Sequence, residues 1–497
     1  MTTLVNPLGA LMTDQLAAPA REAHPADPAD LFLQLYDELP DRHFHGWQAT
    51  RWYDDAGVRR RAGEISEIVL ALGSLSPEVT EENIAEDGDR GRFTVLLGLD
   101  GALAHANPYG PYHDAPALTG LTVRYLTEGR LNGDEREGAL LPRCAFPGRP
   151  RGRRTKAEFF GVHRVPPEEW AKVDHTLLPP VLDPHFDRDE PVPVGCVPVL
   201  ETFDDIEIDF ERRYGMTVYR LRPSDSHVSR DRIETIIRRL DEAGARIAVM
   251  PEVSLSDTLL ERWKEAAFHT AGRDRGRHPL RFLLLGSGPL GTDDPPPNRA
   301  VLIDRWTGRE LLVQDKLSGF TLDAAQMRLW RLPGAPSTGT ADEYLTPGSK
   351  VGLLDSSFGR LAVLICEDLS RSVGWERELL SCGVSHLFVP IFSKPILRYR
   401  WEQQAAERQI SALGGWVTVA NSLVIGTAVP ADELQGPRYT ALVAGPGDPA
   451  RASYAGDVQF ARAKTGEEPA VLDDTRALPA VMPGAAYHLW HDHWPGD

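Results

Sequence analysis

The sequence LAVLICEDLSR, at positions 361–371, places Cys366 directly after a run of apolar residues. The sequence IAVMPEVSLSD, at 247–257, places Glu252 after a similar run. Short apolar runs of this length are typical of buried strands. In layered α/β proteins, functional groups gather at the carboxyl ends of strands. Both stretches therefore predict a layered α/β fold with a site at one edge of its sheets.

A third stretch, VQDKLSGF at 313–320, contains Lys316 just after a strand-like run. The gaps along the chain are 316 − 252 = 64 and 366 − 316 = 50 residues. Gaps of this size are too long for a local motif, so the three residues can meet only through tertiary structure. We expect their side chains to lie within about 8 Å of one another, the reach of a direct or one-water contact.

The region from 190 to 460 alternates short apolar runs with amphipathic stretches, as layered α/β proteins do. Helices are expected at 229–245, where Ser229 is a suitable N-cap, and at about 400–413. Strands are expected at 246–250, 281–285, 300–304, 361–365, 386–389 and 416–420.

The ordered set of Glu252, Lys316 and Cys366 resembles the nitrilase-like carbon-nitrogen hydrolase superfamily, and its amidase-like branch in particular. Supporting pieces occur in the family's order. They are GS at 286–287, PNRAVLID containing Asn298, HLFVP followed by Ser393, and the WEQQAAERQ helix leading to VTVANS, which contains Asn421. The resemblance covers about 190–460 and implies a four-layer αββα sandwich of the α/β class.

The chemistry explains why these residue types would be gathered. A thiol is only a few per cent ionised at neutral pH unless a neighbour takes its proton. Glu252 would accept the proton of Cys366 as a general base and then deliver it to the departing amine. Lys316 would stabilise the oxyanion together with a backbone N–H near the cysteine, that of Glu367 being the expected donor.

Other residues of the site are implied by the resemblance. Asn298, Ser393 and Asn421 become candidates for the substrate pocket. Glu367 follows the cysteine, and the C-E-D sequence resembles the glutamine-hydrolysing domains of bacterial NAD synthetases. Glu367 could equally be a hydrogen-bond acceptor behind the site. Many family members carry a second glutamate a few residues past the lysine, and here Asp323 is the nearest carboxylate that could replace it.

The composition narrows the possible partners. The net charge of −18 over 497 residues argues against nucleic acid or an anionic membrane as a partner. No apolar run reaches the roughly twenty residues of a membrane helix. Four cysteines in a chain of this length favour reduced thiols and a cytoplasmic location. We expect a small-molecule amide substrate, no cofactor, no metal, and a homodimer or higher homo-oligomer. The histidines at 43 and 45 are expected to be structural or surface residues, since suitable metal ligands are missing near them.

Punctuation by proline suggests a boundary between Pro179 and Pro193. We therefore expect a disordered tail at 1–30, a separate N-terminal α+β module of unknown function at 31–185, the hydrolase domain at 190–460, and a C-terminal extension at 461–497. Within the N-terminal module we expect a helix at 58–72, a strand at 93–99, and a basic loop at 143–156 that is a solvated surface or contacts an acidic partner.

Each residue of the trio also has a structural reading. Cys366 alone could be a small core residue, Glu252 a carboxylate at a helix start, and Lys316 a surface charge. Two other functions remain open at this level. One is an acyltransferase that passes the acyl group to an amine, and the other is a non-catalytic hydrolase fold used for interaction or regulation.

Overall fold

The computed structural model describes residues 26–109, 115–142, 155–184, 186, 192–272, 278–371, 375–430, 437–445 and 457–472. Most of the basic loop at 143–156, most of the N-terminal tail and the end of the C-terminal extension therefore lie outside the described residues.

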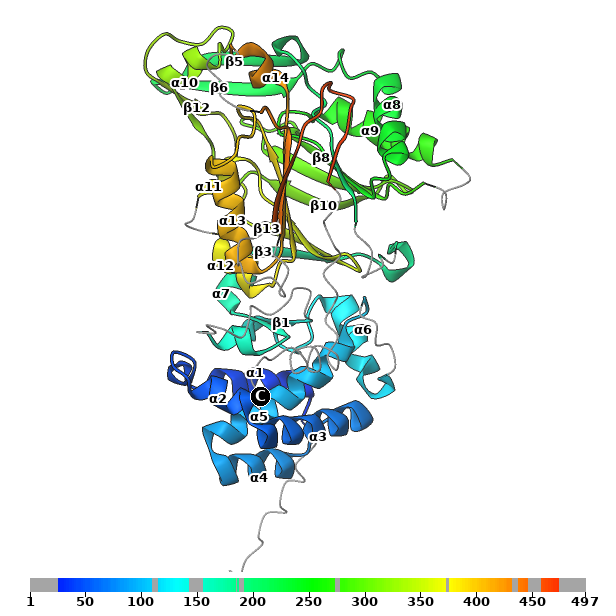
Figure 1. The fold of residues 1–497 in the computed structure, drawn as a ribbon, viewed down its shortest axis with the longest axis vertical. Coiled ribbons are helices and arrows are strands. Elements are labelled where there is room, and N and C mark those ends of the chain that lie inside the picture. Colours follow the sequence, from blue (N-terminus) through cyan, green and yellow to red (C-terminus); the bar gives the residue numbers. More distant parts are fainter. Residues whose placement is uncertain are drawn as a thin grey trace, which may run out of the picture.

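Two β-sheets packed face to face form the centre of the molecule (Figure 1). The first sheet has the order β10 (Glu310–Asp315), β9 (Asn298–Asp304), β8 (Phe282–Pro289), β7 (Ile247–Val249), β4 (Val194–Cys196) and β19 (Ala470–Leu472). The second has the order β18 (Asp457–Ala461), β17 (Ala441–Gly445), β16 (Trp416–Asn421), β15 (His386–Ile391), β14 (Gly359–Val363), β13 (Val351–Ser356) and β3 (Val173–Leu177).

Helices cover the outer face of each sheet, which gives four layers (Figure 1). Helices α8 (Arg230–Glu242) and α9 (Asp257–Ala271) lie on the first sheet, and α11 (Glu367–Ser370), α12 (Glu376–Ser381) and α13 (Trp401–Leu413) lie on the second. The side chain of Ser229 caps α8 by accepting a hydrogen bond from the N–H of Arg232, as its sequence predicts. The expected αββα sandwich is confirmed.

Alternating side chains of the first sheet explain the layering. Val249 and Leu284 belong to the hydrophobic core between the two sheets. Their neighbours Ala248 and Leu283 pack instead into the core beneath the helices. Strands buried on both faces read as continuous apolar runs, which is why the sequence shows them so clearly.

A third, four-stranded sheet lies over one end of the sandwich, at the top of Figure 1. Its order is β11 (Thr321–Asp323), β12 (Thr340–Glu343), β6 (Met216–Pro223) and β5 (Ile206–Arg213). Helix α10 (Ala324–Leu329) connects β11 to β12, and α14 (Val424–Ala428) lies nearby.

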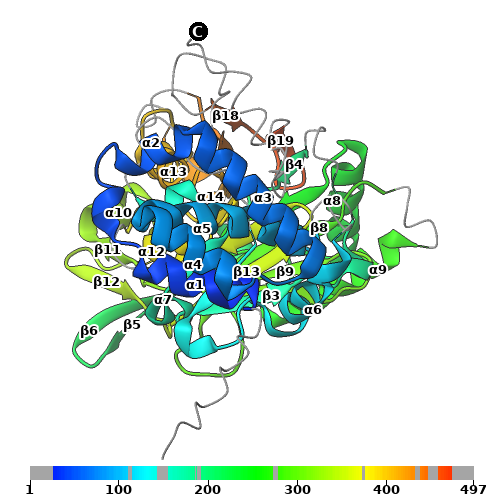
Figure 2. The same ribbon diagram turned by 90° about the horizontal axis from the view of Figure 1, so that it is seen from below.

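The N-terminal region forms a helical layer at the opposite end of the sandwich (Figures 1 and 2). It contains α1 (Pro28–Glu38), α2 (Gln48–Asp54), α3 (Ala56–Leu72), α4 (Pro77–Asp87), α5 (Asp89–Leu103), α6 (Thr119–Glu128), β1 (Ala139–Leu141), β2 (His163–Val165) and α7 (Pro167–Trp170). Short 3₁₀ turns occupy 41–43, 104–106, 116–118, 135–137, 156–159, 180–182 and 203–205.

The expected strand at 93–99 is wrong, because these residues lie within α5. The segment is apolar on every side, and α5 is buried between its neighbours along nearly its whole length from Phe93 to Leu103. A helix buried on all sides loses the 3.6-residue periodicity that distinguishes it from a strand. The expected helix at 58–72 is confirmed within α3.

The N-terminal region is not a separate module. Strand β3 pairs in parallel with β13 and forms the edge of the second sheet. One hydrophobic core runs continuously from the N-terminal helices into the sandwich. The first strand of the sandwich thus begins at Val173, before the expected boundary. The sandwich also extends to β19, within the expected C-terminal extension.

A buried polar cluster joins the two parts. Arg360 pairs with Asp355 at 2.6 Å, and both side chains are fully buried. The hydroxyl of Tyr125, from α6, donates to Asp355. Arg360 also donates to the backbone oxygen of Pro142 at 3.1 Å. Because a buried ion pair is costly to break, these contacts fix the N-terminal layer to the turn between β13 and β14.

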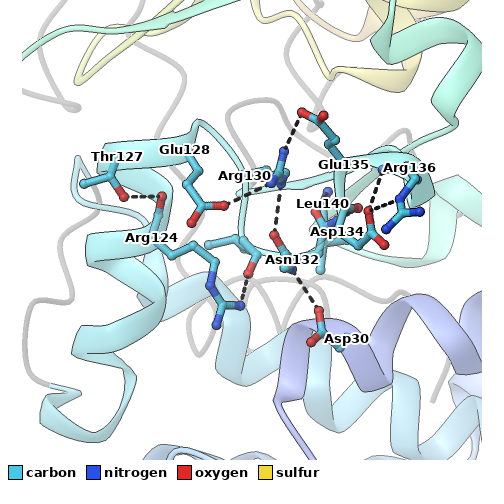
Figure 3. A network of polar contacts seen from close by, with 12 residues as sticks. Asp30, Arg124, Thr127, Glu128, Arg130, Asn132, Asp134, Glu135, Arg136 and Leu140 are labelled. Atoms are coloured by element: carbon cyan, nitrogen blue, oxygen red, sulfur yellow. Dashed lines mark hydrogen bonds and ion pairs between the residues drawn. The ribbon is translucent and has the colours of Figure 1, made fainter.

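Figure 3 shows how polar side chains order the chain between α6 and β1. Asn132 is fully buried and accepts from the N–H of Leu140, while its amide donates to the backbone oxygens of Asp134 and Gly138. The N–H of Gly133 donates to Asp30 of α1. The loop is thereby tied to the first helix.

None of the helices in the described ranges combines the length and the hydropathy that a membrane-spanning helix requires.

Candidate active site

Glu252 lies three residues past the end of β7. It forms a parallel bridge with Ser287 of β8 and is only 4% exposed. The neighbouring Gly286 makes this close approach possible. A Cβ there would lie 1.9 Å from the backbone oxygen of Pro251, and its φ of +73° favours glycine. The GS pair in the sequence therefore has a steric cause.

Lys316 follows β10 and is also buried, with 2% exposure. Its backbone N–H donates to the oxygen of Asn298 at 2.7 Å, which fixes the turn where the side chain begins. Its ammonium nitrogen lies 2.7 Å from Oε1 of Glu252. Two members of the expected trio are thus in direct contact, although they come from strands 64 positions apart (316 − 252).

Cys366 stands between β14 and α11, with a positive φ of +50°. A non-glycine residue in this region is held there by its surroundings, and such strain clusters at functional sites. Its N–H donates to Pro390 of β15 at 3.0 Å. The N–H of Phe392, which follows β15, donates to Oε2 of Glu252 at 3.1 Å. The charges of Glu252 and Lys316 both act on the Cys366 thiol, so the three residues belong to one buried cluster.

A second glutamate completes the cluster, and it is Glu343 at the end of β12. Its Oε2 lies 2.6 Å from the Lys316 ammonium and accepts the N–H of Phe320 at 3.0 Å. Asp323 does not take this position. It is exposed and caps α10 by accepting the N–H of Gln326 at 2.7 Å. The expected role of Asp323 beside Lys316 is corrected in favour of Glu343.

Asn298 holds the two carboxylates in place. Its amide nitrogen donates to Oε1 of Glu252 at 3.0 Å and to Oε1 of Glu343 at 3.1 Å. Both donor hydrogens of the amide are thus engaged. The amide of Asn298 therefore orients the two acidic groups of the site.

The electrostatics of the cluster follow from its burial. Burial raises the pKa of Glu252, and the negative charge of Glu343 raises it further, while Lys316 acts against both. Burial also raises the pKa of the Cys366 thiol, as does Glu252. The pKa of Lys316 is raised well above its ordinary value, because the two glutamates outweigh burial. At rest the thiol is protonated and the lysine is cationic.

The other expected pocket residues have different surroundings. Asn421 is buried, and its side chain accepts from the N–H groups of Ser393 and Ser422 and donates to the oxygens of Ser393 and Lys394. All four of its hydrogen-bonding positions are used by backbone. Asn421 therefore shapes the loop after β15. Ser393 lies on that loop, next to Phe392.

Glu367 begins α11 directly after the nucleophile. Its carboxylate accepts a hydrogen bond from Arg371 at 3.3 Å and is partly exposed. As the first residue of the helix, its N–H has no acceptor within α11. This position leaves both expectations for Glu367 open, and its backbone donor suits a developing oxyanion.

Tyr219 reaches the cluster from β6 and was not found from the sequence. Its hydroxyl donates to the oxygen of Phe320 at 3.3 Å. Burial raises the pKa of this phenol, and the charges of Glu343, Glu252 and Cys366 add to the effect. A lone tyrosine in a polar hairpin carries no sequence signal of such a role.

A cavity of about 100 Å³ borders the Asn298 and Glu343 side of the cluster. Strands β6 and β12 of the third sheet contribute to its lining. The residues that line it are Arg220, Leu221, Arg222, Val253, Gly288, Pro289, Pro296, Asn298, Glu343, Tyr344 and Leu345. Among the described residues, no group of three His, Cys, Asp or Glu could hold a metal ion. His43 instead bonds Gln48 and Asp89 at 2.9 and 2.8 Å.

No protein-family model matches the sequence, and no curated protein matches it. Solved structures do. An amidase from Nesterenkonia sp. is 15% identical, with 61% of this chain and 98% of that chain covered and a TM-score of 0.31. A Saccharomyces cerevisiae member of branch 10 of the nitrilase superfamily is 13% identical, with coverages of 62% and 96% and a TM-score of 0.34.

A carbon-nitrogen hydrolase from Helicobacter pylori is 13% identical, with coverages of 61% and 93% and a TM-score of 0.33. Identities this low say nothing of a shared reaction. The architecture of this chain is seen in its own strand order and helical layers. The chain therefore has a four-layer αββα fold.

Proposed function

We propose that this protein hydrolyses a non-peptide carbon-nitrogen bond, an amide or carbamoyl group, in a small molecule. Cys366 is the nucleophile of the proposed reaction. The observation that supports the proposal is that the Glu252 carboxylate lies 2.7 Å from the Lys316 ammonium and that the charges of both groups act on the buried Cys366 thiol. A base, a nucleophile and a fixed positive charge in one cluster are what acyl transfer requires.

In the first half of the reaction, Glu252 accepts the thiol proton as sulfur attacks the carbonyl carbon. Negative charge develops on the carbonyl oxygen, where Lys316 and the N–H of Glu367 stabilise it. The intermediate collapses when the carbon-nitrogen bond breaks. The leaving amine takes the proton from Glu252, and a thioester on Cys366 remains.

In the second half, Glu252 accepts a proton from water as the water oxygen attacks the thioester. The second tetrahedral intermediate expels the sulfur, which regains the proton from Glu252. The raised pKa of Glu252 suits both roles, because a base works best when its pKa lies near the working pH. Glu343 and Asn298 hold the side chains of Glu252 and Lys316 in position throughout the reaction.

The experiment compares Cys366→Ala with Cys382→Ala, which alters a second buried cysteine outside the cluster. Both proteins are tested against a panel of small amides and carbamoyl compounds, with ammonia release as the readout. We expect turnover by the wild type and the Cys382 variant but none by the Cys366 variant. Equal turnover by both variants would exclude the cysteine mechanism.

The same panel distinguishes hydrolysis from acyl transfer. In the presence of an added amine, a transferase would form a new amide in place of the free acid. We expect the free acid to remain the main product. If no compound of a broad panel is turned over and Cys366 forms no acyl adduct, the non-catalytic alternative gains support.

A further inference from the structure

Asp368 is a buried carboxylate next to the proposed nucleophile that the reaction above does not use. It lies in α11, two residues after Cys366, and is only 2% exposed. Its Oδ2 accepts the N–H of Leu317 at 2.9 Å, and its Oδ1 accepts the hydroxyl of Ser318 at 2.6 Å. Both oxygens are therefore bonded to the two residues that directly follow Lys316.

These two bonds join segments from different sheets. Lys316 leaves the end of β10 in the first sheet, whereas Cys366 leaves the end of β14 in the second. The turn after Lys316 is held on the first sheet by the bond from its N–H to Asn298. Asp368 holds the same turn from the second sheet, so one side chain spans the interface between nucleophile and lysine.

The charged groups around Asp368 explain its ionisation. Burial raises the pKa of Asp368 to about 6, while Ser318, the N–H of Leu317 and the charge of Lys316 lower it. On its own helix, Glu367 and Arg371 pair with each other at 3.3 Å. Arg408, from the packed helix α13, donates to the backbone oxygens at 369 and 370. Asp368 is therefore a carboxylate at neutral pH.

We infer that Asp368 is a positioning residue that fixes the Lys316 ammonium relative to the Cys366 thiol. This inference rests on the proposed function for its catalytic consequence. Its structural consequence can be measured without a substrate. Lys316 lowers the pKa of the thiol, so a displaced lysine leaves the thiol less ionised and less reactive.

Two substitutions separate position from charge. Asp368→Ala removes both bonds to the lysine turn. Asp368→Asn can keep them, because its oxygen accepts the N–H of Leu317 while its amide donates to the Ser318 oxygen. Asp323→Ala is the matched control, since it removes the cap of α10 in the same part of the chain without touching the cluster.

The first readout is the rate at which iodoacetamide alkylates Cys366, followed by peptide mass spectrometry. We expect Asp368→Ala to slow alkylation about tenfold or more, a change of one pKa unit being a factor of ten. The Asp323 control should stay near the wild-type rate at neutral pH. The Asn variant should lie between Asp368→Ala and the wild type, because a neutral acceptor forms weaker hydrogen bonds than a carboxylate. The second readout is turnover, where Asp368→Ala should lower kcat on the order of 100-fold with a smaller change in KM.

The third readout is the ratio of the Asn-variant rate to the wild-type rate as a function of pH. The pH dependence that Glu252 gives to the alkylation rate cancels in this ratio, because both proteins contain Glu252. The wild-type carboxylate gains a proton as the pH falls through about 6. It then matches the neutral asparagine, so the ratio should rise toward one.

Unchanged alkylation and kcat in a folded Asp368→Ala protein would overturn the inference. So would equal losses in the Ala variant and the Asp323 control, since both would then reflect stability alone. A ratio that does not change with pH would remove the role of the Asp368 charge. A wild-type protein without amide turnover would overturn the proposed function but leave the alkylation comparison valid.

Discussion

Replacement of Glu343 by glutamine should move the acid limb of kcat to lower pH. In the proposed reaction Glu252 works as an unprotonated base, so activity is lost as the pH falls through its pKa. The negative charge of Glu343 raises that pKa. Removing this charge lets Glu252 stay ionised in more acidic solution, and the limb shifts accordingly.

The size of the effect follows from the shared lysine. Glu252 and Glu343 bind one ammonium at 2.7 and 2.6 Å. Their nearest oxygens are therefore at most about 5 Å apart, and at an effective dielectric constant of about 20 their repulsion is about 3 kcal/mol. In the wild type the Lys316 ammonium screens part of this repulsion. In Glu343→Gln the ammonium pairs with the Glu252 carboxylate alone.

The assay is kcat against pH for the wild type, Glu343→Gln and the control Asp323→Asn. Asp323 lies closer to Lys316 in sequence, but it is exposed and caps α10. Its substitution should leave the acid limb in place. An unmoved limb in Glu343→Gln, or a limb that moves in the control, would refute the assignment of Glu343 as the second carboxylate of the site.

Three further predictions concern the rest of the molecule. Deletion of residues 1–185 should yield insoluble protein, because it removes the edge strand β3 and Tyr125. A soluble, monodisperse fragment in size-exclusion chromatography would contradict this prediction. Arg360→Met should lower the free energy of unfolding by about 3–5 kcal/mol in urea titration, since it leaves Asp355 charged and buried; a loss below about 1 kcal/mol would argue against the pair. Salt bridging and hydrogen bonds hold the pKa of Asp355 below its ordinary value despite burial. The stabilisation that the Arg360–Asp355 pair gives should therefore be present at neutral pH and be lost in acid, as the Asp355 carboxylate gains a proton.

The parts of the fold that the sequence predicted correctly are those where local pattern and burial agree. Strands such as β14 and β15 are buried on both faces and appear as uninterrupted apolar runs. Strand β3 is different. Its residues alternate between more and less buried positions, and its partner β13 is far away in the sequence. Its place in the sheet is determined by pairing, which a single sequence does not display.

For the site too, residues next to apolar runs were predicted, whereas a residue placed by tertiary contacts was missed. Glu252, Lys316 and Cys366 each follow a strand of the sandwich within three residues, so their positions could be predicted from the sequence. Glu343 lies 343 − 316 = 27 residues after Lys316, beyond α10 and a glycine-rich turn, which hid its relation to the lysine. The available signal was the sequence DEYLTPG at 342–348, a glutamate shortly before a Pro-Gly turn.

The most direct test of the proposed mechanism is to look for the thioester on Cys366. The protein is mixed with an amide that it turns over, quenched in acid within the first turnover, and digested for mass spectrometry. We expect the acyl group on the peptide that contains Cys366, and its loss after treatment with hydroxylamine. Turnover without an adduct at this residue, with Cys366→Ala still active, would contradict the account.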